Sequence, residues 1–133
     1  MTFPVNLTNE EWRERLDEDR FAVLRGAATE APFTGSLLHV TAEGIFSCGG
    51  CGQHLFTSAQ KFDSGCGWPS FDDCIPDTIV EERDASLGMV RTEILCSQCG
   101  GHLGHVFNDG PTATGLRYCV NSVAIDFDEA ESN

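Results

Sequence analysis

The chain has few basic residues: 8 lysines and arginines stand against 21 aspartates and glutamates, which gives a net charge of −13. A surface with this excess of negative charge repels nucleic acids and anionic membranes. The sequence has no apolar run of the ~20 residues that a membrane-spanning helix requires. Its N-terminus also lacks the charged region and apolar core of a secretion signal. We therefore expect a cytoplasmic protein that binds neither nucleic acid nor membrane.

The chain length of 133 residues is typical of one domain, so we expect residues 1–133 to form a single unit. Residues 7–26 predict one or two short helices, because Thr8 and Glu11 have the spacing of a capping box and Gly26 is a stop signal. From residue 36 to 127 we expect a β core. The polar residues 128–133 are expected to be a frayed tail.

Short β-type segments separated by glycine dominate the expected core. Residues 37–40 and 44–47 predict one hairpin, and residues 78–83 and 89–95 predict a second that turns at 85–88. Residues 62–71 contain two glycines and a proline, which predicts a loop. Apolar and aromatic residues in a loop of an acidic protein indicate a binding surface. The remaining expected strands are residues 103–107 and 116–127.

Two distant Cys-x-x-Cys motifs are the most specific signal in the sequence. Cys48 and Cys51 form the first motif, and Cys96 and Cys99 form the second. Each motif follows the end of a β-type segment and is followed by glycine, which allows a tight turn and lets amides point at sulfur. Four thiolates are the ligands of a structural zinc ion. The sequence therefore predicts Zn²⁺ bound by all four cysteines.

These motifs have two alternative interpretations. The motifs could be redox dithiols, but neither has the helix N-terminal context that is usual for them. His102 and His105 follow the second motif closely, so its cysteines and these two histidines could hold zinc without the first motif. That alternative leaves Cys48 and Cys51 without a role, and the all-cysteine site is preferred.

Cys119 is the candidate reactive thiol. In a strand, alternate side chains share a face, which places Arg117, Cys119 and Asn121 together. A nearby guanidinium favours the thiolate, which is the nucleophilic form of cysteine. A free cysteine is more often a small buried hydrophobe. Three successive polar or reactive residues on one face favour the reactive alternative.

Two histidines and a tryptophan are further candidate residues. His102 and His105 indicate proton donation or polarisation of a substrate oxygen. Trp68, within the loop 62–71, offers an aromatic face that could cage a methyl group. Ordinary core packing explains Trp68 equally well when it is considered alone.

Five sequence blocks together resemble the peptide-methionine (R)-S-oxide reductases, also called methionine sulfoxide reductase B. The resemblance runs from about residue 7 to residue 127. It implies a mainly β fold of two small antiparallel sheets with short N-terminal helices, stapled by a four-cysteine zinc site. The blocks are GIFSCxxCGxxLF (44–56), SGCGWPSF (64–71), CxxC (96–99), HLGHVFxDGP (102–111) and GxRYCVNS (115–122).

The resemblance also implies the reaction, which is the reduction of methionine (R)-sulfoxide in proteins or peptides. Cys119 would attack the sulfoxide sulfur and become a sulfenic acid, Cys66 would resolve it as a disulfide, and thioredoxin would reduce that disulfide. By the same resemblance, Trp68 would cage the methyl group of the substrate. The other residues implied at the active site are His102 and His105 on the sulfoxide oxygen, with Asn121, Arg117 and Asp109 as polar members.

Cys74 has no role in the family pattern. It could be a spare buried thiol, which is preferred, or a competing resolving cysteine. The whole chain has two alternative functional classes. A zinc module that only binds a partner does not need Cys119 or Cys66, and a zinc hydrolase needs three protein ligands with a nearby base, for which only Asp109 is close. Nothing in the sequence requires more than a monomer.

Overall fold

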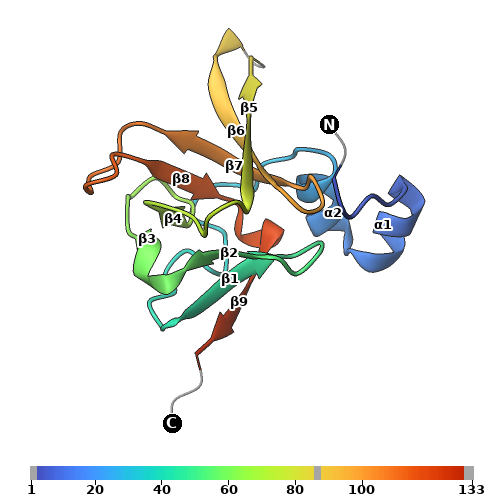
Figure 1. Cartoon of the computed structure of the whole chain (residues 1–133), viewed down its shortest axis with the longest axis horizontal. Helices are drawn as coiled ribbons and strands as arrows, with labels where there is room; N and C mark the ends of the chain where they lie inside the picture. The colour runs from blue at the N-terminus through green and yellow to red at the C-terminus, as the bar shows by residue number, and fades with distance from the viewer. Residues whose placement is uncertain (1–2, 86–87, 131–133) are drawn as a thin grey trace.

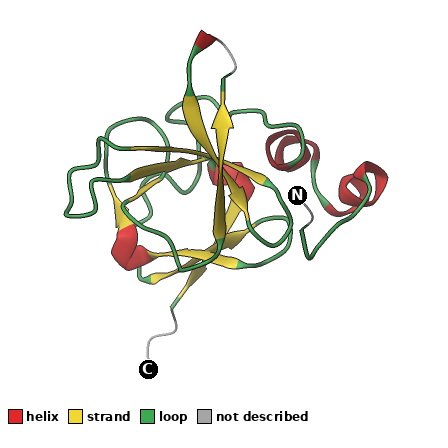
Figure 2. Cartoon of the chain, turned by 45° about the horizontal axis from the view of Figure 1, so that its top comes forward, coloured by secondary structure: helices red, strands yellow, loops and turns green. Residues whose placement is uncertain are grey.

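The structure, a computed structural model, describes residues 3–85 and 88–130. Within this part the chain forms two antiparallel sheets and two short α-helices (Figures 1 and 2). The mainly β fold class expected from the resemblance is therefore confirmed. The elements are α1 (Asn9–Arg15), α2 (Glu18–Leu24), β1 (Gly44–Cys48), β2 (His54–Thr57), η1 (Ser58–Gln60), β3 (Lys61–Phe62), β4 (Ser70–Phe71), β5 (Ile79–Asp84), β6 (Arg91–Cys96), β7 (His102–Phe107), β8 (Arg117–Val120), η3 (Ser122–Ala124) and β9 (Ile125–Glu129).

The helical segment predicted at residues 7–26 is two helices. Thr8 begins α1 with the expected capping box, because its hydroxyl accepts from the Glu11 amide (3.2 Å) while the Glu11 carboxylate accepts from the Thr8 amide (3.1 Å). Leu16 has extended backbone and ends α1, and the Asp17 side chain then caps α2. Helix α2 packs against β7 and η3, so the helices cover one end of the sheets. Each α-helix has 7 residues, too few to cross a membrane.

The hairpin predicted between residues 37–40 and 44–47 is wrong. Residues 37–40 form turns, and β1 pairs instead with β2 on one side and β9 on the other. Leu37 and Val40 are three positions apart and both pack against the core. A turn can present residues at this spacing to one side, whereas a strand alternates its faces at every residue. The second predicted hairpin is confirmed as β5 and β6, with residues 86 and 87 of its turn outside the described residues.

The segment predicted as one β run at 116–127 serves both sheets. Strand β8 lies in the six-stranded sheet, η3 turns the chain, and β9 joins the three-stranded sheet. Asp128 and Glu129 pair with Ile45 and Gly44, so the predicted frayed tail is wrong at these two residues. The backbone of any residue can form the hydrogen bonds of a sheet, so β9, at the edge of its sheet, tolerates acidic side chains. Residues 131–133 lie outside the described residues.

The core lies between the two sheets and contains a cluster of aromatic rings. Phe46 of β1 meets Phe71 of β4 edge to face with 4.9 Å between the ring centroids, and Phe56 of β2 stacks on Phe71 at 4.2 Å. All three side chains are fully buried. Burial of such rings is the main favourable term that holds the sheets together.

Phe71→Ala should lower the free energy of unfolding by about 3–5 kcal/mol, because it removes a ring that contacts both sheets and leaves a cavity. Urea titration followed by circular dichroism measures the loss. Phe33→Ala is the matched control: its ring is 67% exposed, and the change should cost less than ~1 kcal/mol. Equal losses for the two variants would contradict this description of the core.

Candidate active site

The two Cys-x-x-Cys motifs meet in space. Cys48 ends β1 and Cys96 ends β6, and the turn after each strand carries the second cysteine of the motif. The four Sγ atoms lie within 4.8 Å of one another. The distance is 3.6 Å between Cys48 and Cys99. It is 3.5 Å between Cys51 and Cys96.

This cluster fits a metal ion bound by four thiolates. Sulfurs at ~2.3 Å from a tetrahedral zinc ion stand about 3.8 Å apart, close to the observed separations. Gly52 and Gly100 follow the motifs with φ of 84° and 74°, a conformation that favours glycine. The amide of Gly50 donates to Cys48 Sγ at 3.3 Å, as is typical of metal-bound thiolates.

The alternative metal site that includes His102 and His105 is not supported. Among the described residues, the one group of potential ligands that gathers in this way consists of the four cysteines. Both histidines instead make side-chain contacts to carboxylates of the six-stranded sheet. The first motif is therefore not left without a role.

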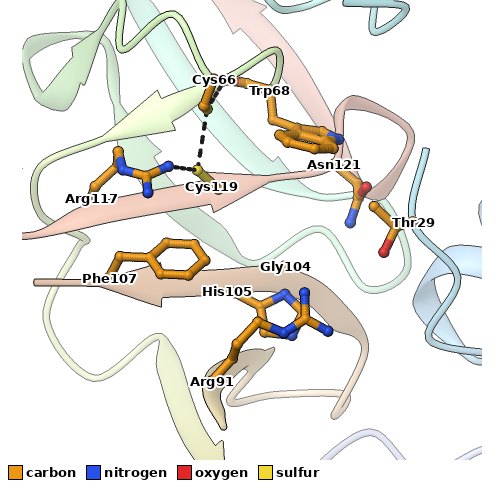
Figure 3. Close-up of a pocket in the computed structure, with 10 residues that line it drawn as sticks. All are labelled: Thr29, Cys66, Trp68, Arg91, Gly104, His105, Phe107, Arg117, Cys119 and Asn121. Carbon is orange, nitrogen blue, oxygen red and sulfur yellow. Dashed lines mark hydrogen bonds between the residues drawn. The ribbon is translucent and has the colours of Figure 1, made fainter. Parts of the chain in front are cut away.

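A separate pocket of about 300 Å³ lies over β7 and β8 (Figure 3). Two predicted residues lie outside its lining: His102 is buried, and Asp109 contacts a lining residue instead of the pocket itself. The predicted residues that the pocket brings together are Cys66, Trp68, His105, Arg117, Cys119 and Asn121.

Strand pairing places Cys119 at the centre of the pocket. In the ladders of β8, Cys119 lies opposite Ser70 of β4 and opposite His105 of β7. The loop that leads into β4 carries Cys66, whose Sγ is 3.3 Å from Cys119 Sγ (Figure 3). Both cysteines are free thiols. A small rotation of either side chain brings the sulfurs to the ~2.0 Å of a disulfide bond.

Arg117 connects this thiol pair to an exposed carboxylate. Its Nη1 donates to Cys119 Sγ at 2.8 Å, while Nε and Nη2 donate to Asp109 at 2.8 and 3.0 Å. The guanidinium carbon also lies 4.5 Å from the centroid of the Phe107 ring. The predicted shared face of Arg117 and Cys119 is therefore present. Asn121 follows the end of β8 and still lines the pocket.

The two thiols differ in acidity. Burial, and then the hydrogen bond and charge of Cys66, raise the pKa of Cys119 to about 12, although Arg117 acts to lower it. Burial also opposes ionisation of Cys66, but hydrogen bonds from Ser64 and Ser70 outweigh it and lower the pKa of Cys66 to about 7. The sequence predicts that Arg117 favours the thiolate of Cys119. Arg117 does act in that direction, but burial and Cys66 outweigh it, so the lower pKa of the pair belongs to Cys66.

Each histidine is paired with a carboxylate. His105 lines the pocket and its Nε2 lies 2.9 Å from Asp84, which also forms an ion pair with Arg91 at 3.2 Å. His102 Nδ1 lies 2.6 Å from Glu93, and burial lowers the pKa of His102. The two rings stand 5.6 Å apart. These carboxylates fix the orientation of both imidazoles.

Trp68 and Asn121 are held by the same residue, Glu30. The Trp68 indole N–H donates to the Glu30 carbonyl at 3.1 Å, and the Glu30 amide donates to Asn121 Oδ1 at 2.9 Å. Asn121 Nδ2 donates to the Leu103 carbonyl at 3.0 Å. These bonds fix which end of the Asn121 amide is nitrogen.

Four residues that line the pocket were not predicted. Thr29 and Arg91 lie far from the recognised motifs and carry no local signal. Gly104 could have been found, because glycine inside a strand often marks a close backbone approach. A Cβ at Gly104 would collide with the carbonyl oxygen of Cys119. Phe107 is the fourth, and it supports the Arg117 guanidinium.

Cys74 lies apart from the thiol pair. Its Sγ is 3.9 Å from the hydroxyl of Tyr118, which precedes Cys119 on β8 and therefore points to the opposite face of the sheet. Burial raises the pKa of Cys74. The structure thus favours the spare buried thiol over the competing resolver.

The family model for the SelR domain matches residues 16–129 of this chain. A protein of Leptospira interrogans named peptide methionine sulfoxide reductase MsrB is 50% identical over 128 residues, which cover 96% of this chain and 98% of that protein. A protein of Bradyrhizobium diazoefficiens with the same name is 56% identical over 119 residues, which cover 89% and 86%. The chain therefore belongs to the SelR-domain family of MsrB proteins.

Alkylation of the reduced protein by iodoacetamide should label Cys66 before Cys119. A lowered pKa means more thiolate at a given pH, so the rate of Cys66 alkylation should rise with pH and reach half its maximum at pH about 7. Cys119, with its pKa raised to about 12, should react more than ~10-fold more slowly at neutral pH. Peptide mass spectrometry of briefly labelled protein measures both rates.

The matched control is Ser70→Ala, which removes a hydroxyl 3.3 Å from Cys66 Sγ and should move the Cys66 midpoint upward. Faster labelling of Cys119 than of Cys66 in the wild type would contradict the lower pKa of Cys66.

Proposed function

We propose that the chain reduces methionine (R)-sulfoxide in proteins to methionine through a cysteine sulfenic acid and an intramolecular disulfide that thioredoxin recycles. Reduction of methionine sulfoxide follows from membership of the family. The observation that carries the finer proposal is the pair of free thiols, 3.3 Å apart at a pocket that also holds Arg117, His105 and Trp68. A cytoplasmic location, where thiols are kept reduced, belongs to the same proposal.

Cys119 is the proposed nucleophile, and its protonated resting state is compatible with this role. The two sulfurs are close enough to share one proton, so transfer from Cys119 to Cys66 moves the negative charge onto Cys119. Arg117 Nη1 then stabilises the Cys119 thiolate at 2.8 Å. Asp109 holds the guanidinium in place through two hydrogen bonds. The pocket thus produces the nucleophile next to its substrate.

The first step transfers the sulfoxide oxygen. The Cys119 thiolate attacks the sulfoxide sulfur, the oxygen accepts a proton, and rearrangement leaves methionine and a Cys119 sulfenic acid. His105, which lines the pocket and is oriented by Asp84, is the proposed donor of that proton. His102 is the proposed second imidazole. Its ring stands 5.6 Å from the ring of His105, behind the pocket lining, and Glu93 orients it.

Trp68 and Asn121 are the proposed substrate-orienting residues. The indole ring lines the pocket beside Cys119 (Figure 3) and offers an apolar face to the methyl group of methionine sulfoxide. The Asn121 side chain, fixed at both ends by hydrogen bonds, presents a rigid polar group next to the thiol. Placement of the methyl group on one side and the oxygen on the other would select the R epimer.

Cys66 is the proposed resolving cysteine. Its thiol condenses with the Cys119 sulfenic acid, which forms the disulfide and releases water. Thioredoxin, a dithiol, then reduces this disulfide by thiol exchange and regenerates both thiols. No backbone rearrangement is required for the condensation, because the sulfurs already lie 3.3 Å apart.

Zinc is the proposed occupant of the four-cysteine cluster, with a structural role. The cluster joins the turn between β1 and β2 to the turn between β6 and β7, and so connects the two sheets. Four protein ligands leave no open position for substrate, as is typical of structural zinc. The metal would fix the end of β6 and the start of β7, on which His102 and His105 depend.

The thiol roles can be tested with a peptide that carries each epimer of methionine sulfoxide, in the presence of thioredoxin, its reductase and NADPH. Only the R epimer should be reduced. Cys119→Ser should lower kcat by at least ~1000-fold, because the nucleophile is lost. Cys66→Ser should form one equivalent of methionine per enzyme and then stall.

Cys74→Ser is the matched control and should turn over at a rate within about twofold of wild type. Continued cycling of Cys66→Ser would contradict its role as resolver. Failure of the wild type to reduce either epimer would remove the enzymatic proposal and restore a zinc-stapled binding module.

The zinc proposal predicts about one zinc ion per purified chain, measured by mass spectrometry of the metal. Cys48→Ser or Cys96→Ser should abolish metal binding and unfold the domain. Structural zinc contributes roughly 10–16 kcal/mol in small zinc-binding peptides, as much as the whole stability of a typical domain. A metal-free variant with an unchanged melting temperature would overturn the structural role.

A further inference from the structure

Residues 25–35 connect α2 to the rest of the chain and carry no recognised motif, yet one of them touches two sides of the active site. Glu30 is half-buried in this connection. Its amide N–H donates to Asn121 Oδ1 at 2.9 Å, and its carbonyl oxygen accepts from the Trp68 indole at 3.1 Å. The backbone of a single residue therefore binds two side chains that line the pocket.

The side chain of Glu30 fixes that backbone to the turn after β8. Glu30 Oε1 accepts from the Val123 amide at 3.1 Å. This amide lies in the first turn of η3, where Asn121 is the N-cap residue but its own side chain caps nothing. Glu30 thus supplies the capping acceptor that Asn121 does not provide.

The anchor is tightly enclosed. A Cβ at Gly35 would collide with both the Glu30 carboxylate and the Ser122 hydroxyl, so the chain closes over this contact. Ser122 is only 3% exposed, and its hydroxyl accepts from the Leu37 amide at 3.3 Å. Burial raises the pKa of the Glu30 carboxyl, and the hydrogen bond from the Val123 amide opposes the rise. A buried acceptor is costly unless a donor meets it, so this donor fixes the position of Oε1.

The alternatives for Glu30 are less consistent with these contacts. Glu30 does not line the pocket, so it is not placed to touch substrate. A purely solubilising surface acid would not direct its carboxylate to the part-buried amide of Val123. Figure 3 shows Thr29, the neighbour of Glu30, beside Asn121 at the pocket, which is where the connection reaches the active site.

We propose that Glu30 is a positioning residue for the reductase reaction: its carboxylate anchors the connection 25–35 to η3, and its peptide groups hold Trp68 and Asn121 in the orientation that receives the sulfoxide. This inference rests on the proposed function for its kinetic consequence. The orientation of the Trp68 indole, by contrast, can be measured without substrate. Loss of the anchor should free the ring and the amide together.

Three substitutions at Glu30 test the anchor. Glu30→Ala removes the acceptor, and Glu30→Asp keeps the charge but shortens the reach; both should lower kcat/KM about 10-fold or more with the R-sulfoxide peptide. Glu30→Gln keeps an oxygen that can accept from Val123 and should stay within about threefold of wild type. Glu14→Ala is the matched control, an exposed acid on α1 that should leave kcat/KM unchanged.

The second readout is the indole N–H signals in a ¹H–¹⁵N spectrum of the full chain. The sequence has two tryptophans, so two signals are expected, and Trp68→Phe assigns them. In Glu30→Ala and Glu30→Asp, the Trp68 signal should move upfield and exchange faster with solvent, because its hydrogen bond is lost. The signal of Trp12, which is 1% exposed in the core, should stay in place.

A general loss of stability would move both indole signals and lower the melting temperature, and that result would overturn the proposal. Wild-type kinetics in both Glu30→Ala and Glu30→Asp would also overturn it. If Glu30→Ala does not fold, the comparison of Glu30→Asp with Glu30→Gln tests the anchor, because only Glu30→Gln keeps the side-chain length of glutamate. If the wild type reduces neither epimer, the proposed function fails, while an unmoved Trp68 signal would count separately against the anchor.

Discussion

The hydrogen-bonded position of β8, between β4 and β7, is the constraint on which the site depends. Its two ladders place Ser70 and His105 on either side of Cys119, and the loop before β4 then delivers Cys66 to the same sulfur. Glycine at position 104 permits the close approach of the neighbouring strand. Strand pairing thus positions Cys119 and His105.

Charge at the pocket is arranged differently from charge on the rest of the molecule. The chain carries 21 acids, yet the group that touches the central sulfur is the guanidinium of Arg117. The nearby carboxylates of Asp109, Asp84 and Glu93 each bind a basic side chain, so they orient arginine or imidazole and do not face the thiols. Local pairing therefore allows a thiolate to form in a strongly acidic protein.

The sequence predicted the parts of the structure that depend on local pattern. Both cysteine motifs, the Thr8 capping box and the hairpin of β5 and β6 have short-range signals, and the resemblance supplied the two-sheet fold. The strand predicted at residues 37–40 was wrong, because the prediction used β propensity and ignored the three-residue spacing of Leu37 and Val40. The net acidity of Cys119 could not be predicted, because the sequence shows Arg117 two positions away but shows neither burial nor the sulfur of Cys66. The contacts of Glu30 join residues far apart in the chain, so no local sequence pattern predicts them.

The passage of one segment from the six-stranded sheet through η3 to the three-stranded sheet has a consequence for biosynthesis. Cys119 lies near the C-terminal end, and its partners come from much earlier in the chain. Such long-range pairings form late, because the entropy of loop closure must be overcome first. An unfinished chain on the ribosome lacks β8 and β9, and with them the arginine and the central thiol of the pocket. The pair of thiols can therefore form only after β8 has been made.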